Sequence, residues 1–427
     1  MNPLSPKLFD KAVEASGFLE AAASEMRVLS SMEWKESWRD KFLATKALPK
    51  PRYAKVDTGA ARAAIADARQ RIDGDHVVLN WLSGIATTLE TTANLIDARG
   101  TKAFFQHSVA LYGQPTQFML DKTTRVLDLA EHMDGVLAEL DFDNLVIAGY
   151  ETQLSSTEFV RALRPRLTKH FGEEAPRVRV SSKLSAKASA SSSRIRVRKD
   201  ATFTERDIDQ LLQHEALIHV ATGMNGKAQE NFQILGRAHA GTTEVQEGLA
   251  VFAEIISGAM DPRRFRRLSG RVLAIDMAIQ GADFKEVYDF FDARVDEPEQ
   301  AYENTRRVFR GGVTSGGAPF TKDMVYLNGL LRVHNFMRTV VRLGRADLIR
   351  VLFCGKMDIN DLPALAQLAS AGRLTPPKFM PPWAKDLRFL VSYMAYSSFL
   401  NQVKMPGFQA HYEEALRDVP EVWSLTS

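Results

Sequence analysis

The sequence predicts a mainly helical α+β fold, and three observations lead to this prediction. Apolar residues recur at helical spacing over most of the chain, from Ser5 onward. Two short segments within residues 177–198 instead alternate strictly between polar and apolar residues, and the helical spacing resumes at Thr204. Helical spacing is typical of amphipathic helices, whereas strict alternation is typical of half-buried strands. We therefore expect a small β-sheet inserted into a helical protein.

The composition is that of a globular protein with a large core. Of the 427 residues, 45% are hydrophobic, and the net charge of +3 is small beside 55 basic and 52 acidic residues. Bulk charge therefore gives no indication of a nucleic-acid or membrane partner. The single cysteine, Cys354, excludes an internal disulfide and cysteine-bound zinc, and its apolar neighbours favour an inert buried thiol. We see no signal peptide in Met1–Glu20 and no membrane span, so we expect a cytoplasmic protein.

The first part of the chain, residues 1–165, is predicted to form a helical scaffold. A connector at Ala47–Asp57 contains Pro49 and Pro51, which stop any helix. The remainder, residues 166–427, would form the catalytic part with a helical C-terminal extension, and we expect the two parts to pack as one unit. The helices expected before residue 165 are Ser5–Met32, Thr58–Ile72, Val77–Ala98, Lys102–Tyr112 and Thr123–Leu140, and those expected late in the chain are Met324–Cys354 and Asp386–Val403.

The two alternating segments, Arg177–Ser181 and Arg194–Arg198, are the expected strands. Lys183–Ser193 lies between them and consists almost entirely of serine, alanine and lysine. Two interpretations stay open for it. It is either a flexible loop, or part of a β-hairpin or meander whose small residues let a ligand backbone approach an edge strand.

A helix starting at Thr204, with Thr204 as its N-cap and Asp207 at the third position, carries the sequence His214-Glu215-Ala216-Leu217-Ile218-His219. Two imidazoles and a carboxylate are the parts of a hydrolytic zinc site, in which the carboxylate serves as base. The histidines are at i and i+5, however, which on a regular helix puts them about 140° apart. Either the pair is a coincidence, or the helix is irregular between them through a π-type bulge or an end at His219. We expect the helix to fade at Gly223, before the turn signal Asn225-Gly226.

A catalytic zinc site needs a third protein ligand. The candidates downstream are Glu230, His239, Glu244, Glu247 and Glu254. Thr243–Gln246 resembles a capping box that opens a helix reaching about Met260, with Glu247 one turn in. Gly248 would let this helix approach the histidine helix closely. Glu254, at i+7 from Glu247, would share its face and could orient a histidine from behind.

Four motifs follow one another along the chain. They are His214–His219 followed by Asn225-Gly226 and Gln229, then Gln246–Ala250, then Arg307–Gly311, and then Thr321–Asp323 with Tyr326 and Gly329. With this ordered set the chain resembles the bacterial "QEGLA motif" proteins, the flavohaemoglobin expression-modulating QEGLA motif family. These are related to the microtubule-associated tyrosine carboxypeptidases, zinc enzymes that remove a C-terminal tyrosine from tubulin. The resemblance covers Lys102 to Gly329 well, and it is weak over the first 60 residues or so and after about Arg373.

The resemblance implies a zincin-like metallopeptidase core in which the small sheet precedes the zinc-binding helix. It implies one Zn²⁺ per chain, a peptide or protein substrate, and a carboxypeptidase-like reaction, although tubulin as the substrate does not follow. Two alternatives stay open: a zinc amidase or endopeptidase, and a non-catalytic regulatory protein in which zinc holds a binding groove in shape. The implied roles are His214, His219 and Glu247 as zinc ligands, Glu215 as general base, Arg310, Lys322 and Tyr326 as binders of the substrate terminus, and Glu254 and Asn225 as supports behind the ligands.

Two further stretches have alternative interpretations. The glycine-rich Gly311–Pro319 is either a substrate-covering loop or a flexible connector, and it lacks the lysine and serine or threonine of a phosphate-binding loop. The basic run Arg263–Arg267, with Arg271, is by default a solvated helix face. It could alternatively attract an acidic peptide or a phosphate backbone. The sequence makes no prediction of oligomeric state.

Overall fold

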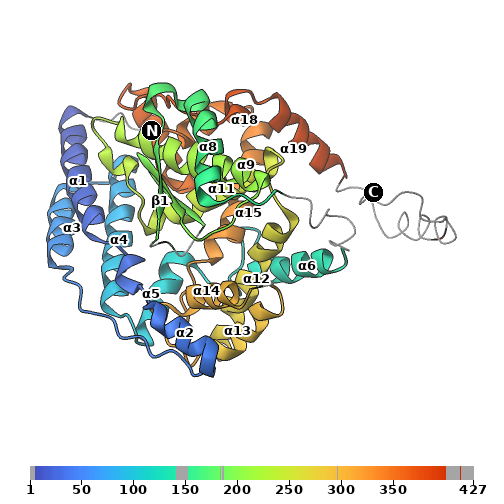
Figure 1. Ribbon diagram of the computed structural model, residues 1–427. Coiled ribbons are helices and arrows are strands. Elements are labelled where there is room, and N and C mark those ends of the chain that lie inside the picture. Colours follow the sequence, from blue (N-terminus) through green and yellow to red (C-terminus); the bar gives the residue numbers. More distant parts are fainter. Residues whose placement is uncertain are drawn as a thin grey trace.

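The computed structural model describes residues 5–140, 152–182, 184, 187–295, 297–400 and 414, and it confirms a mainly helical α+β fold (Figure 1). No helix within these ranges is long and apolar enough to cross a membrane. The helices are α1 (Pro6–Glu25), α2 (Glu36–Thr45), α3 (Gly59–Arg71), α4 (Val77–Asp97), α5 (Ala103–Tyr112), α6 (Val126–Ala138), α8 (Ser156–Phe171), α9 (Glu205–Leu211), η3 (Leu212–Val220), α10 (Ala221–Lys227), α11 (Ala240–Ile256), α12 (Pro262–Ile279), α13 (Phe284–Asp292), α14 (Pro298–Phe309), α15 (Met324–Arg342), α16 (Ala346–Leu352), α17 (Leu362–Ser370), α18 (Pro382–Lys385) and α19 (Arg388–Leu400).

The expected helices before residue 165 are present, with ends that differ by a few residues. The first one stops at Glu25 because Met26 is extended. The helix expected over Met324–Cys354 is divided into α15 and α16 by Gly344, whose φ of +66° a helix interior does not allow. Residues 401–403 of the last expected helix lie outside the described residues. The capping box of Thr204 and Asp207 is confirmed at the start of α9.

The sheet has three strands, β1 (Arg177–Ser181), β2 (Ala188–Ser191) and β3 (Arg194–Arg198), in the order β1-β3-β2. Both expected strands are confirmed. β2 pairs antiparallel with β3, whereas β1 pairs parallel with it. The serine- and alanine-rich stretch therefore contains a hairpin strand, as the second of the two interpretations held. β1 packs on α8, and β2 packs on η3.

The histidine-bearing helix runs without a break through α9, η3 and α10 to Lys227. The expected end at Gly223 and turn at Asn225-Gly226 are therefore wrong. Gly226 is needed for close packing instead, because a Cβ there would lie 2.0 Å from the carbonyl oxygen of Leu235. A glycine in this context is a contact point between two chain segments rather than a turn residue.

The neighbouring helix α11 begins at Ala240, three residues before the expected start. Its N-cap is His239, whose box partner is Thr242, so the expected box of Thr243 and Gln246 is wrong. The close approach expected at Gly248 exists, but its partner is α15 rather than η3. A Cβ on Gly248 would lie 2.1 Å from the carbonyl carbon of Gly329.

Replacing Gly248 by alanine is therefore expected to lower the free energy of unfolding by about 1–3 kcal/mol, because α11 and α15 must move apart. Gly270→Ala in α12 is the matched control. A Cβ there meets nothing within 4 Å, so this helix glycine should tolerate alanine or gain about 0.5–1 kcal/mol. Urea denaturation of both variants measures the difference. Equal stability of the two variants would contradict the Gly248–Gly329 contact.

The largest hydrophobic cluster joins helices from both ends of the chain. Side chains of α1, α3 and α4 share it with those of α11, α15, α16 and α17. A second cluster lies between α2, α6 and α12–α14, and a third joins the sheet to α8, α9 and η3. In Figure 1 the blue N-terminal helices α1, α3 and α4 accordingly lie beside the yellow-green middle part of the chain.

Candidate metal centre

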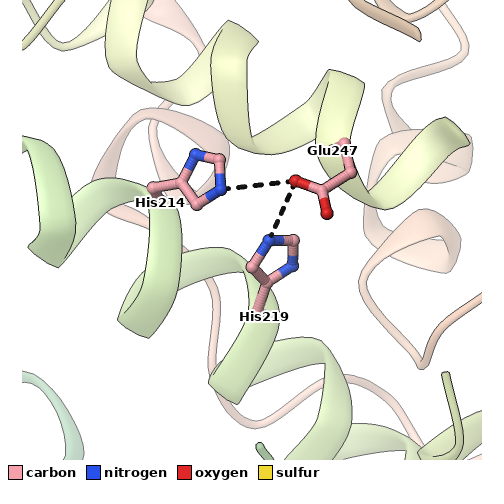
Figure 2. A group of neighbouring side chains, drawn as sticks. All are labelled: His214, His219 and Glu247. Atoms are coloured by element: carbon pink, nitrogen blue, oxygen red, sulfur yellow. Dashed lines mark ion pairs between the residues drawn. The ribbon is translucent and has the colours of Figure 1, made fainter. Parts of the chain in front are cut away.

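The side chains of His214, His219 and Glu247 converge between η3 and α11 (Figure 2). One carboxylate oxygen of Glu247 lies 3.4 Å from Nε2 of His214 and 3.6 Å from Nε2 of His219. The candidate ligand atoms of the three residues all lie within 4.8 Å of one another. This group of side chains could hold a metal ion.

The π-helix η3 explains how histidines five residues apart can meet. The regular α-helix is replaced by π-helix over Leu212–Val220, and the amide of Ala221 accordingly donates to the carbonyl of Ala216, five residues back. In a π-helix, residue i+5 lies about one turn from residue i. The imidazole centroids are 4.9 Å apart as a result. The expected irregularity between the histidines is confirmed, as a bulge rather than as a helix end.

The distances from Glu247 to the two imidazoles fit a zinc ion. In a tetrahedral site with bonds of about 2.0–2.1 Å, neighbouring ligand atoms lie about 3.3 Å apart. The observed distances of 3.4 and 3.6 Å from Glu247 to the two imidazoles are close to this value. Two histidines and one carboxylate are also a donor set found in catalytic zinc sites, which leave one position open.

Glu254 and Arg264 fix the orientation of His214 through Nδ1, the ring nitrogen that does not face Glu247. Nδ1 of His214 is 2.6 Å from Oε1 of Glu254, a fully buried residue, and Arg264 in α12 pairs with both carboxylate oxygens of Glu254. Burial alone would raise the pKa of Glu254, but the charge of Arg264 and the bond from His214 hold it at about 2. Burial would likewise lower the pKa of His214, yet its bonds to Glu247 and Glu254 raise it to about 10. An ionised Glu254 accepts a hydrogen bond from Nδ1–H of His214, so that Nε2 is the ring nitrogen directed at Glu247.

Glu215 follows His214 in η3 and is buried, with 8% of its surface exposed. Within the described part of the chain its carboxylate accepts no hydrogen bond and forms no ion pair. A buried carboxylate is normally paired, because its desolvation is costly otherwise. Its oxygens are therefore available to a water molecule or a ligand at the site.

Gln246 and Lys356 form a polar link beside η3 that the sequence did not point to. Nζ of Lys356 donates to the carbonyl of His219 at 3.0 Å and to Oε1 of Gln246 at 2.9 Å, and Thr222 donates to the same oxygen. Burial lowers the pKa of Lys356 to about 8. This link joins the helix of the histidines to the helix of Glu247. Only the long-range fold brings residue 356 here, so local sequence contained no signal for it.

A cationic cluster surrounds Tyr326, next to the candidate ligands. The guanidinium of Arg271 lies 4.4 Å from the Tyr326 ring centre, and Arg307 and Nζ of Lys322 both lie at 5.8 Å. Arg307 donates to both carboxylate oxygens of Asp323, at 2.6 and 2.8 Å, and to the Tyr326 hydroxyl at 3.3 Å. Lys322 lies 4.0 Å from Glu247. The structure thus brings the expected Lys322 and Tyr326 together beside the expected ligand Glu247.

Arg310 is buried in the same region, with 5% of its surface exposed. It has no ion pair among the described residues, and its Nε has no hydrogen-bond partner. Burial and the nearby charge of Arg307 lower its pKa to about 10. An unpaired buried guanidinium is costly, so this position is suited to an anionic ligand.

The glycine-rich Gly311–Pro319 is not a flexible connector, because the segment is packed into the protein at both ends. A Cβ on Gly311 would meet Met32 and Phe104 within 2.4 Å, and one on Gly316 would lie 2.2 Å from the carbonyl oxygen of Gly281. The amide of Gly317 also donates to the carbonyl of Ala278. The glycines therefore allow tight packing of a fixed loop.

Asn225 lies elsewhere than expected. Its amide nitrogen donates to the carbonyls of Phe353 and Phe379, and its oxygen accepts from the amides of Lys378 and Phe379. The side chain thereby ties α10 to the C-terminal segment. We expected Asn225 to support the metal ligands, but its side-chain bonds stabilise the packing of the fold instead.

The basic run is divided between several partners rather than forming one solvated face. Arg264 contacts Glu254, Arg271 contacts Asp323 and Tyr326, and Arg266 lies 3.6 Å from Asp134. Three of the five arginines therefore contact acidic groups of the protein, and two of these three, Arg264 and Arg271, lie next to the candidate site. The sequence could not predict these partners, because the spacing of arginines on a helix does not reveal which acidic groups the helix packs against.

Comparison with known families adds an independent finding. The family described as microtubule-associated tyrosine carboxypeptidase matches residues 40–402, a range that contains every residue of the candidate site. A comparison with curated proteins finds no match. Family membership implies a carboxypeptidase-like peptidase with a protein or peptide substrate. Since the match covers most of its length, the chain belongs to the microtubule-associated tyrosine carboxypeptidase family.

Proposed function

We propose that this protein is a zinc-dependent, carboxypeptidase-like peptidase that hydrolyses a peptide bond at or near the C-terminus of its substrate. The observation that carries the proposal is the convergence of His214, His219 and Glu247 at zinc-like spacing, with the unpaired Glu215 beside them. One zinc ion per chain would be held by the two Nε2 atoms and the Glu247 carboxylate.

Glu215 is the general base in this proposal. A bound zinc ion would lower the pKa of water towards about 7 and polarise the scissile carbonyl. The Glu215 carboxylate accepts the proton of the attacking water and returns it to the leaving amine. Glu254, ionised and fixed by Arg264, keeps the Nδ1 proton of His214 in place during these steps.

Arg310, Lys322 and Tyr326 would bind the α-carboxylate of the substrate. A terminal carboxylate needs fixed cations and hydroxyl donors close to the hydrolytic centre. Nζ of Lys322 lies 4.0 Å from Glu247 and 5.8 Å from the centre of the Tyr326 ring. Arg310 contributes a buried positive charge that lies 5.8 Å from the Phe320 ring centre and forms no ion pair with a described residue.

The test is incubation of the zinc-loaded protein with peptides that vary in their last two residues, followed by mass spectrometry. Loss of one C-terminal residue supports the proposal, and the variation in yield identifies the preferred residue. Internal cleavage that persists when the C-terminus is blocked would instead support a zinc amidase or endopeptidase. No cleavage of any peptide, with stoichiometric zinc present, would favour a regulatory protein in which zinc only shapes a groove.

Arg310→Gln is expected to reduce kcat/KM for peptides with a free C-terminus about 10- to 100-fold, which corresponds to about 1.5–3 kcal/mol for a charged hydrogen bond. The matched comparison is a C-terminal amide of the same peptide. Wild type should hydrolyse the amide poorly, and Arg310→Gln should leave that residual rate unchanged. An equal loss on both peptides would show that Arg310 does not recognise the carboxylate.

Arg264→Gln is expected to weaken zinc binding about 10- to 100-fold, because Glu254 loses the cation that fixes its carboxylate against His214. Competition with a chromophoric chelator measures the affinity. Arg266→Gln is the control, since Arg266 lies on the same helix but faces Asp134. Wild-type affinity in Arg264→Gln would remove Glu254 and Arg264 from the metal centre.

A further inference from the structure

The outward face of the sheet carries a grid of arginines. β1 and β3 pair in register, so that Arg177 lies opposite Arg194 and Arg179 lies opposite Arg196. Neighbouring strands are about 4.8 Å apart, and alternate residues on one strand are about 6.7 Å apart. All four arginines are exposed. Four positive charges are therefore gathered on one small, flat surface.

None of these four side chains forms an ion pair or hydrogen bond with another described residue. The third arginine of β3, Arg198, does have a partner and lies 3.6 Å from Asp200. Like charges directly opposite each other on a sheet are destabilising. The grid thus costs folding stability without a compensating acidic group in the described part of the chain, which points to an anionic partner.

The free edge of the sheet adjoins this grid. Among the described residues β1 has a neighbouring strand on one side only, and an open groove of about 480 Å³ follows its other side. The groove lies between β1 and α8, and its walls include Arg164, Leu167 and Thr168. An edge strand with an adjoining groove can accept an extended peptide as an additional strand.

The opposite face of the same edge is apolar and incompletely covered. Val180 on β1 is 40% exposed, whereas its register partner Val197 on β3 is fully buried. A strand added beside β1 would send alternate side chains to the two faces. One set would meet Arg177 and Arg179, and the other would cover the exposed side chain of Val180.

We propose that the free edge of β1 and the arginine grid form a docking site for an extended, acidic segment of a partner protein. The segment adds to β1 as a fourth strand, with alternate acidic and apolar side chains. The backbone edge selects a polypeptide. Nucleic acid fits less well, because no aromatic side chain lines the groove or the grid to stack a base. The site lies at the opposite edge of the sheet from β2, the strand that packs on η3, and it does not depend on the proposed hydrolysis.

Fluorescence anisotropy with the full chain tests the proposal. The probe is a labelled ten-residue peptide of alternating glutamate and valine that carries a C-terminal amide, so that the candidate active site contributes little to binding. Two comparison peptides have the same length. One has its glutamates and valines in separate blocks, and the other has lysine in place of glutamate. Tight binding of the alternating acidic peptide, with at least tenfold weaker binding of both others, is the expected result. Equal binding of the two acidic peptides would overturn the strand-addition geometry.

The paired variant Arg179→Thr with Arg196→Thr should weaken peptide binding at least tenfold. The control variant, Arg338→Gln with Arg342→Gln, removes the same charge from two exposed positions on α15 and should bind as wild type does. If both variants lose affinity equally, net charge is responsible and the site is refuted. A stronger effect of the paired variant on a single-stranded oligonucleotide, or on self-association seen by sedimentation, would also refute it.

Thermal unfolding separates docking from a structural role. Because the opposed arginines repel each other, the paired threonine variant should melt at a slightly higher temperature than wild type at low salt. The gain should vanish at about 0.5 M salt, where the Debye length is only a few ångströms. A lower melting temperature would show that the arginines support the fold, and the loss of binding would then count against the proposal.

Discussion

Replacing Glu215 by glutamine is expected to lower the rate of peptide hydrolysis about 10³-fold while each chain keeps one zinc ion. General base catalysis contributes about 10²- to 10⁴-fold, and an amide of nearly the same size cannot accept the proton. Since Glu215 accepts no hydrogen bond from another described residue, the substitution breaks no internal contact of the described structure. The measurements are kcat on the best peptide of the library and zinc content by elemental analysis.

Glu244→Gln is the matched control for this variant. Glu244 lies one turn before Glu247 on α11 and pairs with Arg332, at 3.0 Å, rather than with the candidate ligands. It should keep both zinc and activity. Undiminished hydrolysis by Glu215→Gln would assign the base to another group. If wild type has no peptidase activity and Glu215→Gln keeps the cellular function, the zinc-containing regulatory protein becomes the better interpretation.

The unusual spacing of the histidines shows what local sequence can predict. Two imidazoles at i and i+5 point in different directions on a regular helix, so they can bind the same metal ion only if the helix is irregular. The π-helix η3 has that irregularity. The donor types narrowed the third ligand to a few candidates downstream. Only the resemblance selected Glu247 among them, and the packing of α11 against η3 places it between the two rings.

The contacts behind the site could not be predicted, because they join residues far apart in the chain. Arg264 is fifty residues from His214, and Lys356 is 110 residues from Gln246. Nothing in a basic helix or in an isolated lysine identifies the carboxylate or carbonyl that it will meet. The Gly248 contact was mispredicted for the same reason. Glycine indicates that two segments approach closely, but it does not identify the second segment.

The start of α11 was mispredicted because two local capping patterns overlap there. Thr243 followed by Gln246 has the pattern of a capping box, but Thr242 makes the reciprocal bonds with His239. The helix therefore starts earlier, and Gln246 lies within it, where its side chain is free to reach Thr222 and Lys356. One local pattern thus replaced another, and such caps are worth only about 1 kcal/mol.

His219→Ala is expected to abolish stoichiometric zinc binding and to reduce hydrolysis to background. Two remaining ligands cannot fill a catalytic site that takes three from the protein. The variant should still fold, because His214 keeps its bond to Glu254 and Glu247 keeps its contact with His214. His132→Ala is the control, since His132 is exposed on α6 and outside the candidate group. It should retain one zinc ion per chain.

Chelation distinguishes a true metal centre from a hydrogen-bonded histidine pair. A ligand that binds only the folded state stabilises it by RT ln(1 + [L]/Kd), or about 4 kcal/mol at a thousandfold excess over Kd. Wild type should therefore melt at a lower temperature after zinc is removed and should recover when zinc is restored, whereas His219→Ala should show no response to either treatment. If wild type is also unresponsive and purifies without zinc, the three side chains only support the packing of η3 on α11, and the proposed hydrolysis fails with them.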